Sequence, residues 1–345
     1  MGSARAAGAR SSSGALPPTA LEGEELVFRL SDPEHDHAEV KVWCDLQLGI
    51  ELDMARVEGG WELRLPLPDL DCLEYLFEVD REMSPDPGNP ELVEGAFGPH
   101  SWLAMPGYQP PAWLHEPSRP GDRHQLSVGD VDVEVWEPAE HAGEPLPLLL
   151  VHDGPEMDKY GGVVRYAATR PPLRVALLNP GPWRDKRYAA SSAYAATLVG
   201  EVLPAVTDAF ATSARPVLLG QSLGALAALH AAWTTPGTFA GLMLQSGSFF
   251  TPRLDPQESG YSHFAQVAGF VATILDAQKA ADRLEVTMTC GTAEENLANN
   301  LLMRDQLREV GLNVAWGEVR QGHTWTCWRD SLHPHLGELL TRAWG

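Results

Sequence analysis

Hydrophobic and polar residues follow two different patterns in the two parts of the chain. Between residues 21 and 104, apolar and polar residues alternate with a period of two in four short runs, Glu25–Leu30, Glu39–Trp43, Trp61–Leu67 and Leu73–Val79. Such alternation, with turn residues between the runs, is typical of strands that bury one face only. Residues 21–104 are therefore predicted to form a small all-β, immunoglobulin-like sandwich domain.

From residue 123 onward the apolar runs become continuous. They are Pro147–Val151, Leu173–Asn179, Pro216–Gly220, Gly241–Leu244, Leu284–Thr289 and Val314–Arg320. Continuous apolar strands indicate a sheet that is buried on both faces. Segments with helical patterns lie between or after them: Ala195–Phe210, Leu223–Thr234, Phe264–Ala281, Asn296–Val310 and Trp328–Trp344. This alternation predicts a doubly wound, mostly parallel α/β domain over residues 123–345.

Two further segments have no such pattern. Residues 1–20 are rich in Ala, Ser, Gly and Pro and contain no apolar stretch of the kind found in secretory signals, so they are predicted to be a disordered tail. Residues 105–122 begin with the Pro/Gly-rich stretch Met105–Pro111 and are predicted to be a linker between the two domains.

The charge of the chain limits its partners. The sequence has 25 Lys+Arg against 47 Asp+Glu, a formal net charge of −22. Such an acidic protein is not expected to bind nucleic acid or an anionic membrane, because both require a basic surface. The first 120 residues hold 8 basic and 22 acidic residues, so −14 of the charge lies there and −8 in the remainder.

Cysteine and histidine patterns indicate neither a disulfide scaffold nor a metal site. The four cysteines form no C-x-x-C pair and are too few for a disulfide framework in a chain of 345 residues. The pairs His35/His37 and His333/His335 lack further ligands at usable spacing. We therefore expect no metal and no other cofactor, and a cytoplasmic location.

The central chemical signal is the segment Gly220-Gln221-Ser222-Leu223-Gly224, which matches the nucleophile-elbow pattern G-x-S-x-G. An apolar strand runs directly into it and an Ala/Leu-rich helix runs out of it, which is the context that the pattern requires. The turn would expose the Ser222 hydroxyl and direct the backbone N–H of Leu223 at a developing oxyanion. The second domain is therefore predicted to be an α/β hydrolase.

A serine nucleophile needs a base and an acid, which in this fold follow in the order serine, acid, histidine. Of the five histidines after Ser222, only His323 lies in a loop directly after the last predicted strand. His323 is therefore the expected general base. The acid should follow the strand that ends at Gly291, where Glu294 and Glu295 are both available. Carboxylates also favour the first turn of a helix, so the pattern alone leaves both open.

Several motifs together resemble the bacterial enterochelin (enterobactin) esterases, within the esterase-D group of α/β hydrolases. They are Asp86-Pro87-Gly88-Asn89-Pro90, Gly95-Ala96-Phe97-Gly98 with Ser101, Glu201-Val202-Leu203-Pro204, the elbow, Gln245-Ser246-Gly247-Ser248-Phe249, and Gly322-His323 with Cys327-Trp328-Arg329. His152-Asp153-Gly154 is similar to that family's Leu-Asp-Gly segment. The resemblance implies hydrolysis of the ester bonds of a ferric or iron-free cyclic triserine catecholate siderophore, with Glu294 as the acid.

The chain also departs from that family. Asp185-Lys186-Arg187-Tyr188-Ala189-Ala190 stands where the family has Asp-Arg-x-x-Glu-Leu, and the elbow continues with Ala225 rather than Gly. Pro155 has no N–H, so a second oxyanion donor is expected from Gly154, from Glu156 or from elsewhere.

An anionic siderophore would need a local basic cluster on this acidic protein. The candidates are Trp183, Arg184, Lys186, Arg187 and Arg329, with the tryptophan as a stacking surface, although a solvated loop has the same composition. The residues leave two alternatives to a siderophore esterase. One is a carboxylesterase or acyltransferase of the same fold that acts on another acyl ester, such as a feruloyl or acetyl ester. The other is a ligand-binding protein on a hydrolase scaffold.

Overall fold

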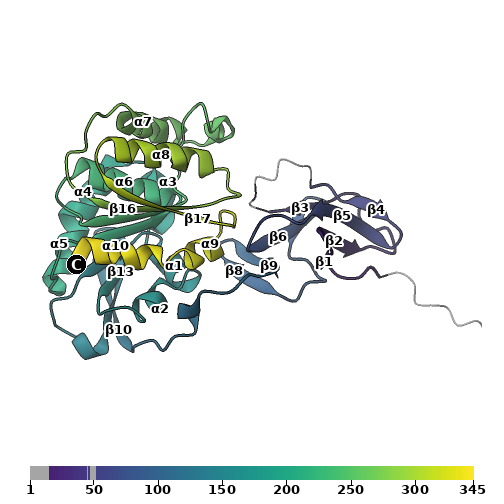
Figure 1. The fold of residues 1–345 in the computed structure, drawn as a ribbon, viewed down its shortest axis with the longest axis horizontal. Coiled ribbons are helices and arrows are strands. Elements are labelled where there is room, and N and C mark those ends of the chain that lie inside the picture. Colours follow the sequence, from purple (N-terminus) through teal and green to yellow (C-terminus); the bar gives the residue numbers. More distant parts are fainter. Residues whose placement is uncertain (1–14, 45, 47–51) are drawn as a thin grey trace, which may run out of the picture. The chain divides into compact units, whose positions relative to one another are not determined.

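The computed structural model describes residues 15–44, 46 and 52–345. They form two compact units, one that ends at Pro106 and one that begins at Gly107 (Figure 1).

The first unit consists of two antiparallel sheets. One has the strand order β1-β2-β5-β4, and the other has the order β3-β6-β9-β8 with β7 paired to β6. The four alternating runs of the sequence form β2, β3, β5 and β6. The strands are β1 Ala20–Glu22, β2 Glu25–Ser31, β3 Val40–Trp43, β4 Ala55–Val57, β5 Gly60–Pro66, β6 Cys72–Val79, β7 Glu82–Ser84, β8 Leu92–Gly95 and β9 Gly98–Ala104.

The second unit contains one sheet of eight strands in the order β10-β11-β13-β12-β14-β15-β16-β17. β10 pairs antiparallel with β11, and β11 pairs antiparallel with β13. The six strands β12 to β17 run parallel to one another. The six continuous apolar runs form β12 to β17, whereas the hairpin β10–β11 was not predicted. The strands are β10 Gly121–Val128, β11 Val131–Pro138, β12 Leu148–Val151, β13 Arg174–Leu178, β14 Val217–Gln221, β15 Gly241–Gln245, β16 Glu285–Gly291 and β17 Asn313–Val319.

Helices cover both faces of this sheet, which explains why its strands are apolar throughout (Figure 1). Along β12, Leu148 and Leu150 pack into one core and Leu149 and Val151 into the other. Each buried leucine stabilises the fold by roughly 1.5–3 kcal/mol. The helices of the first face are α3 Arg184–Tyr188, α4 Ser192–Thr197, α5 Leu203–Ala209, α6 Leu223–Thr234, α7 Phe264–Leu275 and α8 Leu297–Glu309. Those of the second are α1 Gly154–Lys159, α2 Val163–Ala167, α9 Trp325–Asp330 and α10 His335–Trp344.

Three predicted helices differ from the observed ones. The segment 195–210 is helical but contains a π-helical turn, Leu198–Val202, between α4 and α5. The predicted helix 264–281 ends earlier, at Leu275. There the amide of Gln306 caps the helix by donating to the carbonyls of Ile274 and Ala277, each at 3.0 Å. The prediction of one helix over 328–344 is wrong. Two helices, α9 and α10, are separated by a turn that includes Pro334, which has no N–H to donate to a helical carbonyl.

The segment 107–122, interpreted from its composition as part of a linker, contributes to the core of the second unit. It contains a short 3₁₀ helix, Ala112–Leu114, whose Trp113 is fully buried. The Trp113 ring packs edge to face on Tyr166 with the ring centroids 5.3 Å apart.

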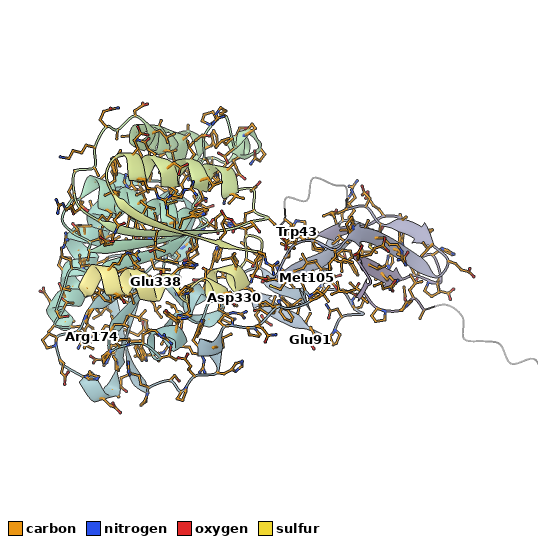
Figure 2. The ribbon with its side chains drawn as sticks, in the orientation of Figure 1. Trp43, Glu91, Met105, Arg174, Asp330 and Glu338 are labelled. Atoms are coloured by element: carbon orange, nitrogen blue, oxygen red, sulfur yellow. The ribbon has the colours of Figure 1, made fainter. Side chains whose placement is uncertain are left out.

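The two edges of the parallel sheet differ in chemistry. Arg174, labelled in Figure 2, begins β13 at the amino end of the strands. It is fully buried, lies 2.9 Å from the Glu137 carboxylate and donates to the carbonyls of Ala211 and Glu144. All of its partners are thus internal, which gives this edge a structural ion pair. The residues predicted to be nucleophile, base and acid lie at the opposite, carboxyl edge.

Candidate active site

Three neighbouring strands are each followed by a residue with a positive φ angle. Asp153, Ser222 and Ser246 follow β12, β14 and β15, and their φ angles are 46°, 54° and 48°. Positive φ is uncommon for residues other than glycine, and such strained residues concentrate at functional sites. The carboxyl edge of these three strands is therefore the candidate active site.

The glycines of the elbow are required by close packing. A Cβ atom on Gly220 would lie 2.2 Å from the carbonyl oxygen of Gly224, and one on Gly224 would lie 3.1 Å from Cβ of His152. This close approach of strand and helix holds Ser222 at the turn between β14 and α6. The Ser222 hydroxyl is 3.1 Å from Nε2 of His323 and 3.3 Å from the hydroxyl of Ser248.

His323 joins the serine to a buried carboxylate. Its Nδ1 lies 2.8 Å from Oε2 of Glu294, whose side chain is wholly buried. The other oxygen, Oε1, accepts the hydroxyl of Ser246 at 2.6 Å and the N–H of Gly291 at 2.7 Å. Glu295 is exposed, and its carboxylate lies 3.4 Å from the Gln257 amide nitrogen. Of the two glutamates left open by the sequence pattern, the structure thus brings Glu294 to the imidazole. A hydroxyl, an imidazole and a carboxylate joined in series can activate a serine for attack on a carbonyl.

The two expected oxyanion donors begin two neighbouring helices. Leu223 is the first residue of α6 and Gly154 the first of α1, and the strands that precede them, β14 and β12, are paired. The first amides of a helix have no acceptor inside it, so they can donate to a negatively charged oxygen. Position 154 has no room for a side chain, because a Cβ on Gly154 would lie 2.4 Å from Cα of Leu177.

His152 lies directly behind the elbow. It is fully buried, and its Nδ1 is 2.8 Å from the carbonyl oxygen of Gly224. Because a carbonyl only accepts hydrogen bonds, Nδ1 carries the proton and donates it. Burial lowers the pKa of His152 from 6.5 to about 4, so the side chain is neutral in the folded protein at neutral pH.

This buried histidine should make the fold sensitive to acid. Below pH 6.5 the unfolded chain protonates His152 while the folded chain does not, so stability falls as the pH falls towards 4. The shift corresponds to a loss of about 3 kcal/mol. We expect His152→Leu, which introduces the residue of the resembled family, to lose this part of the pH dependence. Urea unfolding of both proteins at pH 7 and pH 4 measures it, and parallel pH profiles for the two would contradict the assignment.

Arg184 forms an ion pair with the buried carboxylate of Asp153. Its Nε and one terminal nitrogen each lie 2.7 Å from an oxygen of Asp153, which is 2% exposed. Burial lowers the pKa of the Arg184 guanidinium, but the hydrogen bonds and the charge of Asp153 outweigh this effect and raise it. The backbone N–H of Asp153 donates to the Tyr188 hydroxyl. Arg184, expected to contact substrate, thus holds the residue that precedes Gly154.

The other expected binding residues lie in two further places. Trp183, Lys186 and Arg187 line a pocket of about 350 Å³ together with Tyr194, and Trp183 is 63% exposed. Arg187 also forms an ion pair with Asp130. Arg329 lies on α9, where it contacts Asp330, labelled in Figure 2, at 2.8 Å and the Tyr108 hydroxyl at 3.0 Å. The basic cluster of the sequence is therefore divided in space.

Two serines that the structure brings to the site were not assigned a role from sequence patterns. Ser246 contacts Glu294, and Ser248 contacts Ser222 through both its hydroxyl and its backbone N–H, which donates to the Ser222 carbonyl at 3.2 Å. Both lie in the segment Gln245-Ser246-Gly247-Ser248-Phe249, so its match to the esterase family was the available signal.

The described residues contain neither a group of metal ligands nor a single helix of membrane-spanning length. Within that part of the chain, no three His, Cys, Asp or Glu side chains are grouped so that they could hold a metal ion. No single described helix is long and apolar enough to cross a bilayer; one pair, 181–188 with 192–209, meets that test only when joined across a bend of 111°.

Comparison with known proteins gives sequence matches to one family. The model of the putative esterase family matches residues 183–339. The Iron(III) enterobactin esterase of Escherichia coli (strain K12) is 31% identical over 126 residues, which are 36% of this chain and 30% of that protein. The enzyme of the same name from Dickeya dadantii (strain 3937) is 27% identical over 220 residues, 59% of this chain and 49% of that protein. The matched stretches thus span less than half of either relative.

Solved structures show the same fold over most of the chain. The enterobactin esterase from Shigella flexneri, crystallised in the presence of enterobactin, superposes with a TM-score of 0.73 at 22% identity and covers 93% of this chain and 94% of its own. A ferulic acid esterase matches with a TM-score of 0.53 at 18% identity over 66% of this chain and all of its own. The second unit therefore has an α/β-hydrolase-like fold. Over residues 183–339 the chain is thus similar to the putative esterase family, and it resembles enterobactin esterases in sequence and in fold.

Proposed function

We propose that the protein is a serine carboxylic ester hydrolase, with Ser222 as nucleophile, His323 as general base and Glu294 as the acid that orients the imidazole. The observation that carries this proposal is the continuous series from the Ser222 hydroxyl to His323 Nε2 at 3.1 Å and from His323 Nδ1 to Glu294 at 2.8 Å. Leu223 and Gly154 supply the N–H groups for the oxyanion.

The reaction then proceeds through an acyl-enzyme. Oγ of Ser222 attacks the ester carbonyl carbon while Nε2 of His323 takes the hydroxyl proton. The negative charge on the carbonyl oxygen is stabilised by the N–H groups of Leu223 and Gly154. The C–O bond breaks as His323 returns the proton to the departing alcohol. Water, deprotonated by His323, then releases the acid and restores Ser222.

The substrate class that we propose is a catecholate siderophore trilactone, ferric or iron-free, of the enterobactin type. The curated relatives are Iron(III) enterobactin esterases, and the sequence motifs around Ser222 and His323 resemble that group. A ferric triscatecholate is an anion, and this chain carries −22. Its binding would therefore depend on local cations. Lys186 and Arg187 line one pocket with the exposed Trp183 and are the candidate residues for binding an aromatic anion. Arg329 is a further candidate at a separate place.

The N-terminal unit is proposed to be an immunoglobulin-like sandwich. Its two antiparallel sheets, of four and five strands, support that assignment.

Product analysis tests the substrate directly. We expect incubation with ferric and iron-free catecholate trilactones to give the linear trimer first and then smaller serine catecholates, identified by mass spectrometry. Feruloyl and acetyl esters, with and without an added alcohol acceptor, test the alternative of a carboxylesterase or acyltransferase. Turnover of these esters with intact trilactone would overturn the siderophore assignment and leave the serine mechanism standing.

A further inference from the structure

Ser246 lies at the centre of a buried hydrogen-bond chain behind His323. The residue is 1% exposed and occupies the strained position after β15, where φ is 48°. Its hydroxyl lies 2.6 Å from Oε1 of Glu294 and 3.0 Å from the indole Nε1 of Trp328. Like Ser222 after β14, Ser246 thus follows its strand with a positive φ.

The direction of this chain follows from the chemistry of its members. An indole N–H can only donate, so the Ser246 oxygen accepts from Trp328. The single proton of the hydroxyl is thereby left for the carboxylate of Glu294. One oxygen of Glu294 receives two donors, Ser246 and the N–H of Gly291, while the other faces His323. This arrangement fixes the rotation of the carboxylate about its own axis.

Trp328 acts on the imidazole as well. Its ring packs edge to face against His323, with the centroids 5.0 Å apart and the planes at 87°. A second tryptophan, Trp325, packs edge to face against Trp328 with the ring centroids 4.8 Å apart. One indole therefore contacts the imidazole through its ring and, through Ser246, the carboxylate that orients it.

We propose that Ser246 and Trp328 are positioning residues that hold Glu294 and His323 in line with Ser222. This inference rests on the proposed serine mechanism and adds two residues to it. Neither side chain takes part in bond making. The hydrogen bond that the Ser246 hydroxyl donates to the buried carboxylate is charge-assisted and therefore strong. Its loss should reduce turnover rather than substrate binding.

The test is the steady-state hydrolysis of a p-nitrophenyl ester by Ser246→Ala. We expect kcat to fall about 10- to 100-fold with KM nearly unchanged, because a hydrogen bond to a charged group is lost only from the catalytic network. Trp328→Phe keeps the ring and removes the N–H, and a fall of about 3- to 10-fold in kcat is expected. Wild-type kcat in Ser246→Ala would overturn the proposal.

The double variant distinguishes a relay from two separate contributions. If Trp328 acts on Glu294 through the Ser246 hydroxyl, Ser246→Ala with Trp328→Phe should lose no more activity than Ser246→Ala alone. Multiplied losses would overturn the relay. Trp328→Phe also provides the answer if Ser246→Ala does not fold.

Ser331 offers a matched control. It is also buried, and its hydroxyl accepts from the Gln245 amide at 2.7 Å and donates to the Trp328 carbonyl at 3.1 Å. It also lies 3.4 Å from the Thr289 hydroxyl, so its hydrogen-bond partners differ from those of Ser246. Ser331→Ala should lower the melting temperature as much as Ser246→Ala does while kcat stays at the wild-type value. An equal fall of kcat in Ser331→Ala would show a general packing effect and overturn the positioning role. The Ser222→Ala variant distinguishes failure of the positioning role from failure of the serine mechanism. Activity in that variant would overturn the serine mechanism itself.

Discussion

Replacing Ser222 by alanine is expected to reduce kcat/KM for a p-nitrophenyl ester by about 10⁴-fold or more, because only this hydroxyl can form the acyl-enzyme. His323 and Glu294 would remain in place but would have no nucleophile to activate. The oxyanion donors of Leu223 and Gly154 are backbone groups and would persist, which accounts for any residual rate above that of water. Initial rates measured at saturating and at limiting ester concentration give the loss.

Two further measurements make this result specific. A fluorophosphonate probe should label the wild-type protein on Ser222 and leave Ser222→Ala unlabelled. The variant should unfold in urea at nearly the wild-type midpoint, since the change removes one partly exposed hydroxyl. Undiminished turnover in a folded Ser222→Ala protein would reject the mechanism.

Replacing Gly220 by alanine is expected to destabilise the fold by about 3 kcal/mol, because the added methyl group has no room. Its Cβ would lie 2.2 Å from the carbonyl oxygen of Gly224, 2.4 Å from the carbonyl carbon and 2.8 Å from the N atom of Ala225. All three are backbone atoms of the helix that follows the nucleophile, so they cannot turn aside as a side chain would. The helix must shift, and Ser222 with it.

Urea unfolding measures this loss, and esterase activity should fall together with it. Gly269→Ala is the matched control, because Gly269 lies on the exposed side of α7 with no atom within 4 Å of the added Cβ. There the same change should stabilise the protein by about 0.5–1 kcal/mol. Equal unfolding free energies for Gly220→Ala and the wild type would mean that the elbow does not need its first glycine.

The basic loop shows why local pattern was insufficient for the binding residues. Arg184, Lys186 and Arg187 are close in sequence and were grouped as one cluster. The structure folds them into α3, where Arg184 and Lys186 are two positions apart and point in different directions. Arg184 faces Asp153, whereas Lys186 and Arg187 line a pocket with Trp183. A segment of only five helical residues has too few turns for its periodicity to be visible in the sequence.

The six parallel strands of the second unit and the candidate nucleophile could be predicted from the sequence. Six apolar runs became parallel strands because each had to bury both faces, and the elbow was predictable because strand, glycines, serine and helix are adjacent in the chain. Chain order further singled out His323 as the expected base.

Which side chains meet depends on the folded arrangement of the strands. His323 is 101 residues from Ser222, and Trp328 is 82 residues from Ser246. Their contacts depend on the order of β14, β15, β16 and β17 in the sheet, which brings the carboxyl ends of separate strands to one edge. Glu294 and Glu295 are neighbours in a turn, and the pattern around them is the same for both. Their difference arises from direction alone: one carboxylate points into the buried layer between Ser246 and His323, and the other lies at the surface.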